Sequence, residues 1–108
     1  MKKVYRVKKT QEFQEILNYK RYYSSPAFVI YIKPKKEEVA RVGISVGKKI
    51  GKAVQRNKIK RQVRMMVQDI YNFQENFDTI ILVRVKYCEE RYINNKKSLE
   101  RLVKKVKI

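Results

Sequence analysis

The side chains best suited to binding a ligand are concentrated in one segment, "GKKIGKAVQRNKIKRQVR", which begins at Gly47. The chain has no acidic residue between Val39 and Gln68. The basic residues of the segment are Lys48, Lys49, Lys52, Arg56, Lys58, Lys60, Arg61 and Arg64. Arginine and lysine at this density are suited to phosphate groups, which accept charge-assisted hydrogen bonds from them. Asn57, the neutral polar residue among them, either contacts such a ligand or braces the backbone through a local hydrogen bond.

Helical geometry places most of these charges on one side of a helix. At about 100° per residue, five polar side chains share a stripe beside the apolar face. This basic stripe consists of Arg56, Asn57, Lys60, Arg61 and Arg64, and Lys58 points to a different side. Like charges four residues apart destabilise an isolated helix by about 0.2–0.5 kcal/mol per pair, so a merely solvated face gains nothing from them. The pattern therefore favours contact with a phosphate backbone.

Composition excludes several catalytic chemistries. The chain has no histidine and a single cysteine, Cys88, which excludes a zinc finger and any histidine-dependent catalytic centre. The stretch "GISVGKK" from Gly43 differs from a phosphate-binding loop, because three residues separate its glycines and Lys49 stands where that motif needs Ser or Thr. We therefore predict no catalytic residue, no metal site and no small-molecule substrate for the protein itself. A single cysteine also fits a reducing cytoplasm.

The charge of the whole chain indicates a polyanionic partner. Its 108 residues suit one domain, 1–108, in which 28 Lys and Arg against 10 Asp and Glu give a formal net charge of +18. Solubility does not require such an excess, so nucleic acid is the first candidate partner and an anionic membrane surface the second. No apolar run is long enough to predict a transmembrane helix, and "MKKVYRVKKT" lacks the apolar core of a secretory signal.

Hydrophobic periodicity predicts elements in the order α-β-β-α-β-α, an α+β sandwich. We expect helices over about 10–20, from about Ala53 toward Phe73, and from within 91–96 to about 107. Strands are expected over 27–33, 41–46 and 77–85, and the third should be central because it is almost continuously apolar. "RYYSSP" is expected to be a break after the first helix, and the first two strands are expected to pair as a hairpin.

One face of the predicted sheet offers a second kind of contact. Alternation places Phe28 in an aliphatic core row, whereas Tyr31 shares the opposite, open face with Gly43 and Ser45. Phe13 lies on a helix that must cover part of the sheet. Tyrosine on a sheet beside basic residues is suited to stacking unpaired bases.

These residues carry a resemblance to a known family. "RVGISVGKKIGKAVQRNKIKRQVR", the basic segment 41–64, resembles the signature of the bacterial ribonuclease P protein subunit, which is centred on an Arg-Asn-basic triplet. "EFQEIL", "FVIY" and "NNKKSLERL" fall where that family has its first helix, first strand and last helix. The resemblance extends over residues 3–107.

The resemblance implies a fold, a role and two RNA partners. The fold is like the second domain of ribosomal protein S5, with a left-handed crossover around the signature helix where a right-handed one is usual. In this family a large RNA subunit cleaves precursor tRNA in the cytoplasm, with Mg²⁺ held by the RNA and the substrate. The protein binds this ribonuclease P RNA through its basic helix. It also holds the single-stranded 5′ leader of precursor tRNA between the sheet and the first helix.

The same resemblance implies roles for individual residues. Binding of the RNA subunit is expected at Lys48, Lys49, Lys52, Arg56, Asn57, Lys60, Arg61 and Arg64. The leader path is expected to follow Phe13, Leu17, Tyr31 and Ser45. Leu17 stands where the family commonly has a second aromatic residue, so no stacking contact is expected there.

Two other functions fit part of the pattern. A ribosomal protein or another structural RNA-binding module would use the same basic helix but would not need an open aromatic face. A helix bound to a membrane surface would need its apolar side free, whereas that side is needed here to close the core between strands.

Overall fold

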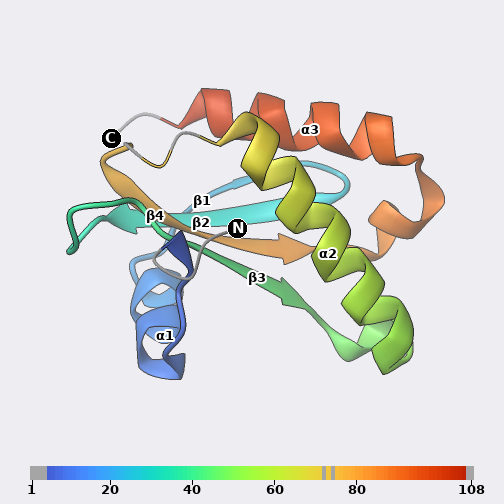
Figure 1. Ribbon diagram of the computed structural model, residues 1–108, viewed down its shortest axis with the longest axis horizontal. Coiled ribbons are helices and arrows are strands. Elements are labelled where there is room, and N and C mark those ends of the chain that lie inside the picture. The colour runs from blue at the N-terminus through green and yellow to red at the C-terminus, as the bar shows by residue number, and fades with distance from the viewer. Residues whose placement is uncertain (1–4, 72, 74, 107–108) are drawn as a thin grey trace.

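A computed structural model of the chain describes residues 5–71, 73 and 75–106, with helices on both faces of one four-stranded sheet (Figure 1). The helices are α1 (Thr10–Asn18), α2 (Ala53–Ile70) and α3 (Tyr92–Lys105). The strands are β1 (Arg21–Ser24), β2 (Phe28–Pro34), β3 (Val42–Val46) and β4 (Phe77–Val83). Two short 3-10 helices, η2 (Lys48–Ile50) and η3 (Val85–Glu89), precede α2 and follow β4.

The predicted α+β class and its three helices are confirmed, with shifts at the helix ends. α1 ends at Asn18 because Lys20 adopts a left-handed backbone conformation, φ 60°, that leads the chain into β1. α2 ends at Ile70, since Tyr71 is already extended. α3 is described to Lys105, and its expected end near 107 lies outside the described residues.

The sheet has the strand order β1-β2-β4-β3. β4 lies inside the sheet, as its apolar sequence predicts, antiparallel to β2 and parallel to β3. Ile80 and Ile81 of β4 point to opposite faces, and both are fully buried. A strand with two apolar faces is stabilised only where both faces are covered, and α1 covers one while α2 and α3 cover the other (Figure 1).

The predicted hairpin between the first two strands is wrong. β2 and β3 do not pair with each other, because β4 lies between them. The hairpin was expected because strands that follow one another along the chain usually pair. Here the loop from Lys35 to Arg41 instead carries the chain across the position that β4 later fills.

The strand that does form a hairpin with β2 is β1, which falls in the stretch expected to be a break. Arg21 pairs with Ile32 and Ser24 with Val29 in antiparallel register. Three of the four residues of β1 are exposed, so the strand lacks the apolar alternation by which strands are recognised. Tyr23 alone packs against the main core.

The crossover between the parallel strands β3 and β4 is made by α2. In Figure 1 both strands run toward the right with β3 below β4, and α2 crosses in front of them. This is the left-handed sense that the family resemblance implies, and it places α2 along the edge of the sheet that β3 forms.

The main core lies between the sheet and the pair α2 and α3. It contains inward-facing residues of all three long strands together with the apolar faces of both helices. Ile30 of β2, Ile81 of β4, Val63 and Met66 of α2, and Leu99 of α3 are essentially inaccessible to solvent. The apolar face of α2 is therefore used within the fold and is not free to enter a membrane.

A smaller core lies on the other side of the sheet, under α1. Val7, Ile16 and Ile80 are buried in it. α1 comes so close to β3 that a Cβ atom added at Gly43 would lie 2.6 Å from Cζ of Phe13. The missing side chain of Gly43 thus sets the distance between α1 and the sheet.

Replacing Gly43 by alanine (G43A) is expected to lower the free energy of unfolding by about 1–3 kcal/mol, the usual effect of overpacking a core. The new methyl group would also lie 2.7 Å from Cδ1 of Ile80, so the Phe13 ring and α1 must shift. Urea denaturation measures the change. The control is G47A, because Gly47 has an extended backbone and nothing within 4 Å of the equivalent Cβ position. Equal stability of G43A and the unmodified protein would contradict the close approach.

Candidate nucleic-acid interface

The basic stripe lies on one flank of α2 and has no acidic partner. Asn57 and Arg61 are exposed, while Arg56, Lys60 and Arg64 are half-buried beside the core-facing residues. Among the described residues, none of the stripe's four cations forms an ion pair with an acidic side chain. Ion pairs in the described structure are formed instead by Lys33, Lys36, Arg41, Lys86, Lys96 and Lys104. The segment that has no acids in its sequence therefore also has no ion-pair partners within the described structure.

The side chain of Asn57 is exposed and makes no hydrogen bond with the described part of the chain. A bracing role at the start of the helix would require such a bond. Its amide is thus open to a partner outside the chain, at the centre of four positive charges.

Three further basic residues lie before α2, and Lys52, the last of them, lines a cavity together with Lys58 on the flank of α2 opposite to the stripe. Lys48 and Lys49 lie in η2, Lys52 immediately precedes α2, and all three are exposed. Gly51 makes the turn between the two helices with φ 152°, a conformation that favours glycine. These three lysines also form no ion pair with any described residue.

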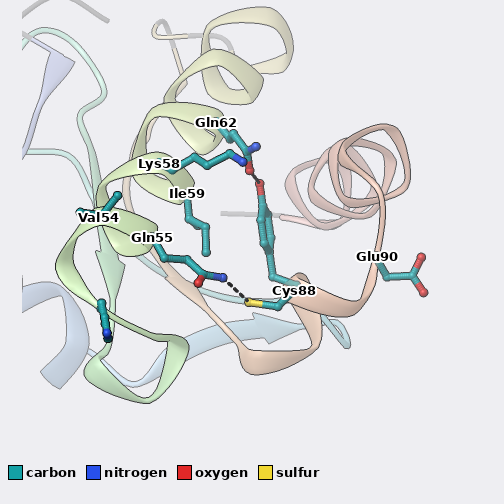
Figure 2. A pocket seen from close by; sticks show the side chains of 9 residues that line it. Val54, Gln55, Lys58, Ile59, Gln62, Cys88 and Glu90 are labelled. Atoms are coloured by element: carbon teal, nitrogen blue, oxygen red, sulfur yellow. Dashed lines mark hydrogen bonds between the residues drawn. The ribbon is translucent and has the colours of Figure 1, made fainter.

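The opposite flank of α2 lines a cavity and carries a mixture of polar and apolar side chains. There Lys58 lines a cavity of about 560 Å³ between α2 and η3, together with Gln55, Gln62 and the exposed Cys88 (Figure 2). The hydroxyl of Tyr87 donates a 2.8 Å hydrogen bond to Oε1 of Gln62, which accounts for a polar residue at that position of the helix. Lys58 is therefore separated from the basic stripe, as the helical geometry predicts.

The four predicted leader-binding residues lie on the face of the sheet that α1 covers in part. Phe13 and Leu17 of α1 and Tyr31 of β2 pack together against the small core with Leu82 of β4. Ser45 of β3 is half-buried and is the neighbour of Leu82 across the parallel ladder. We call this partly open surface, made by Phe13, Leu17, Tyr31, Ser45, Leu82 and Val29, the α1-side face.

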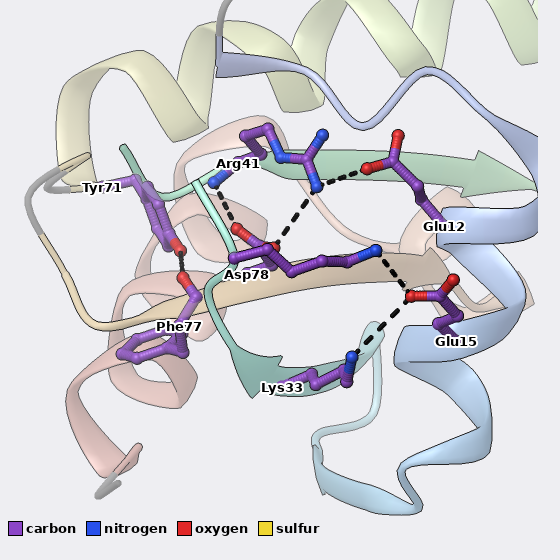
Figure 3. Close-up of polar contacts among 8 residues, drawn as sticks. Glu12, Glu15, Lys33, Arg41, Tyr71, Phe77 and Asp78 are labelled. Carbon is purple, nitrogen blue, oxygen red and sulfur yellow. Dashed lines mark hydrogen bonds and ion pairs between the residues drawn. The ribbon is translucent and has the colours of Figure 1, made fainter. Parts of the chain in front are cut away.

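α1 is fixed to the sheet by a buried cluster of charges (Figure 3). Nη2 of Arg41 lies 2.6 Å from Oε2 of Glu12 on α1 and 3.5 Å from Oδ2 of Asp78 on β4. The backbone N–H of Arg41 also donates a 2.9 Å hydrogen bond to Oδ1 of Asp78. The contact with Arg41 lowers the pKa of Glu12, whereas burial raises the pKa of Asp78 in spite of the same cation. One guanidinium thus joins the helix to the central strand.

A second, more exposed pair of contacts holds the same helix. Nζ of Lys36 lies 2.7 Å from Oε2 of Glu15, and Nζ of Lys33 lies 3.8 Å from the same oxygen. The hydrogen bond from Lys36 lowers the pKa of Glu15. These contacts are solvated and so add less to stability than the buried cluster does.

Comparison with known proteins connects this arrangement to one family. A family model described as Ribonuclease P matches residues 1–107. The "Ribonuclease P protein component" of Mycoplasma capricolum is 48% identical over 105 residues, which cover 94% of each chain. That of Geobacillus sp. is 39% identical over 107 residues, covering 97% of this chain and 92% of the relative. This chain belongs to the ribonuclease P protein family.

Solved structures agree with the assignment to the ribonuclease P protein family. The RNase P protein of Staphylococcus aureus superposes with a TM-score of 0.83 at 36% identity, covering 93% of each chain. Ribonuclease P is a ribonucleoprotein endoribonuclease in which the protein is the accessory component, so family membership implies an RNA partner. Within the described residues no helix is long and apolar enough to span a membrane.

Sequence reasoning missed the buried charge cluster of this ribonuclease P protein. Arg41 and Asp78 are 37 residues apart, and a pairing at that distance leaves no periodic pattern. One signal was nevertheless present, because "FDTIILV" contains an acid inside a strand expected to be central. A buried carboxylate needs a partner, so Asp78 predicted a cation near it without saying which one.

Replacing Glu12 by glutamine (E12Q) is expected to lower the melting temperature at neutral pH, because the variant lacks the anion closest to Arg41. The pKa of Glu12 in the folded protein lies below its usual value. The ion pair therefore stabilises the fold above the ordinary carboxylate range and is lost as the pH falls through the lowered pKa. The difference in melting temperature between the two proteins should shrink below about pH 4.

Thermal unfolding followed by circular dichroism across this pH range makes the measurement. The control is E89Q, since Glu89 forms an exposed pair with Lys86 at 3.8 Å and is expected to change stability by less than about 1 kcal/mol. A difference for E12Q that does not vary with pH would rule out the ionised pair as its cause.

Proposed function

We propose that the chain binds the RNA subunit of ribonuclease P and the 5′ leader of precursor tRNA, and so assists endonucleolytic removal of the leader. The observation that carries the proposal is the basic stripe of α2, whose cations have no acidic neighbour in sequence and no ion-pair partner among the described residues. Four cations held close together without counter-ions repel one another. A phosphate backbone that meets them would relieve this repulsion and release its own counter-ions.

In this proposal the RNA subunit contacts the basic stripe and the lysines before it: Lys48, Lys49, Lys52, Arg56, Asn57, Lys60, Arg61 and Arg64. The arginines are suited to bidentate contacts with phosphate, and Asn57 to a 2′-hydroxyl or a base edge. The bond-breaking chemistry belongs to the RNA. As the family resemblance implies, the proposal assigns Mg²⁺ to the RNA and the substrate.

The leader is assigned to the α1-side face. A single-stranded segment offers bases that can stack on an aromatic ring, and Tyr31 is half-exposed at the centre of this face. Phe13 and Leu17 border it as apolar walls supplied by α1, and the Ser45 hydroxyl supplies a polar contact on the β3 side. The arrangement is suited to RNA without a fixed sequence, because stacking tolerates every base. Such a protein would work in the cytoplasm, where precursor tRNA is processed.

A structural RNA-binding module is the alternative within the same class. It would use the basic stripe equally well, so only the α1-side face distinguishes the two functions. A structural module gains nothing from a half-exposed tyrosine there, whereas a leader-binding subunit requires one.

Replacing Lys60 by alanine (K60A) is expected to weaken binding to ribonuclease P RNA and to reduce its salt dependence. If the stripe and its neighbours meet about five phosphates, log K falls with log salt at a slope of about −3.5, and each cation removed makes the slope less steep by about 0.7. The matched control is K58A, two residues away on the other flank of α2, which should leave the slope unchanged. Filter binding over a salt series measures both. Equal slopes for K60A and K58A would refute the assignment of the stripe.

Replacing Tyr31 by alanine (Y31A) is expected to weaken binding of leader-bearing precursor tRNA, by about 1–3 kcal/mol if one base stacks on the ring. Mature tRNA should bind as before, because it has no leader. Tyr31→Phe retains the ring and should bind the precursor normally. Binding is measured with the chain reconstituted with a bacterial ribonuclease P RNA at low Mg²⁺. Under the same conditions the chain should accelerate 5′ cleavage by that RNA, and the chain alone should cleave nothing. Equal losses of affinity for precursor and mature tRNA would contradict leader binding and would favour the structural RNA-binding module.

A further inference from the structure

We infer that Tyr22, on the edge strand β1, is a second base-stacking residue that extends the leader-binding surface beyond Tyr31. The inference rests on the proposed function, because it assigns an additional part of the same single-stranded RNA. Its ligand is one further unpaired nucleobase, farther along the leader than the base on Tyr31. Sequence analysis did not find this residue, since it lies in the stretch expected to be a break.

The register of the sheet places the two tyrosines together. Tyr22 is the direct cross-strand partner of Tyr31 in the antiparallel pair of β1 and β2, so both side chains point to the α1-side face. Their ring centroids lie 5.4 Å apart with an interplanar angle of 36°. The same row continues through Ile80 of β4 to Gly43 of β3. Tyr22 is therefore the outermost member of a row that crosses the whole sheet.

The exposure of its side chain distinguishes Tyr22 from an ordinary core residue. Its side chain is 58% exposed, whereas Tyr23, the next residue, packs into the main core on the other face. A cross-strand aromatic pair stabilises a hairpin, which explains the contact between the rings but not the exposure of Tyr22. One side of the ring meets Tyr31 and much of the rest is accessible to solvent, as a stacking platform for a base requires.

Charge around the pair favours RNA over an apolar partner. Lys20, two residues before Tyr22, is exposed and forms no ion pair with a described residue. Lys33, two residues after Tyr31, points to the same face as the pair and makes a 3.8 Å, solvated contact with Glu15. The net charge of +18 adds a favourable field for any polyanion that reaches this edge. A nucleotide whose base stacks on Tyr22 would thus have cations near its phosphate groups.

The strand order places Tyr22 at the end of the α1-side face that is farthest from β3. β1 and β3 are the outer strands, three strand spacings apart, which is roughly 14 Å. Ser45 lies on β3, Tyr31 on β2 and Tyr22 on β1. The basic stripe belongs to α2, which packs on β3 at one edge of the sheet. A leader that enters from this edge, beside the bound RNA subunit, meets Tyr22 only after it has passed Tyr31. The contribution of Tyr22 must therefore depend on leader length.

The test measures binding of precursor tRNAs whose leaders are shortened one nucleotide at a time, by the chain assembled with ribonuclease P RNA. Y22A is expected to weaken binding of long-leader precursors about fivefold, which corresponds to about 1 kcal/mol. The loss of affinity in Y22A should disappear once the leader is shorter than a threshold length. In Y31A the loss of affinity should persist with leaders shorter than this threshold. Tyr22→Phe should bind like the unmodified protein, and Tyr22→Leu, which has no ring, like Y22A.

The matched control is Y19A, because Tyr19 is similarly exposed, at 47%, but lies at the end of α1 and has no ring contact with another described aromatic residue. It should not alter binding at any leader length. Equal binding by Y22A and the unmodified protein at every length would overturn the inference, as would a loss that extends to mature tRNA. If Y31A shows a leader-dependent loss and Y22A does not, only the inference fails. If the unmodified protein shows no dependence on the leader, the proposed function fails as well.

Discussion

The buried guanidinium of Arg41 determines where α1 lies, and the geometry of the α1-side face follows from that. It joins Glu12 of α1 to Asp78 of the central strand at 2.6 and 3.5 Å, and the residue is only 8% exposed. Removing either acid would leave a buried cation with one partner fewer, which proteins tolerate poorly. Gly43 sets how near the helix comes, and the ion pairs set its position along the sheet. Phe13 and Leu17 border the α1-side face only because both constraints act together.

Four of the ten acids of this strongly basic chain hold elements together. Glu12, Glu15 and Asp78 fix α1, and Asp69 at the far end of α2 pairs with Lys96 of α3 at 2.8 Å. None of them reaches the basic stripe. The result is a chain with neutralised contacts inside the fold and an uncompensated surface on one flank of α2. This separation of charge explains how a chain of net charge +18 can fold and still attract a polyanion.

Sequence periodicity predicted those elements of the fold whose formation depends on residues close together in the chain. Helical periodicity located α2 and separated Lys58 from the basic stripe, because both follow from the 100° step of a helix. The apolar run around Ile80 likewise identified β4 as a central strand. The strand order was not predictable in this way, because it depends on a crossover that inserts β4 between β2 and β3. β1 was missed because an edge strand needs no apolar alternation, and the partners of Arg41 because they are distant in sequence.

The two outer strands of the sheet differ in whether another segment pairs with their free edge. β3 is met by the N-terminal segment, where the Val7 N–H donates a 3.2 Å hydrogen bond to the carbonyl of Val42, whereas β1 has no second strand partner among the described residues. An uncovered edge of this kind can pair with the same edge of another copy. In dilute buffer the mutual repulsion of the basic chains opposes such pairing, but salt screens it over about 8 Å at physiological ionic strength. Concentrated salt, which weakens the attraction of a basic protein for any polyanion, therefore also removes its electrostatic protection against self-association.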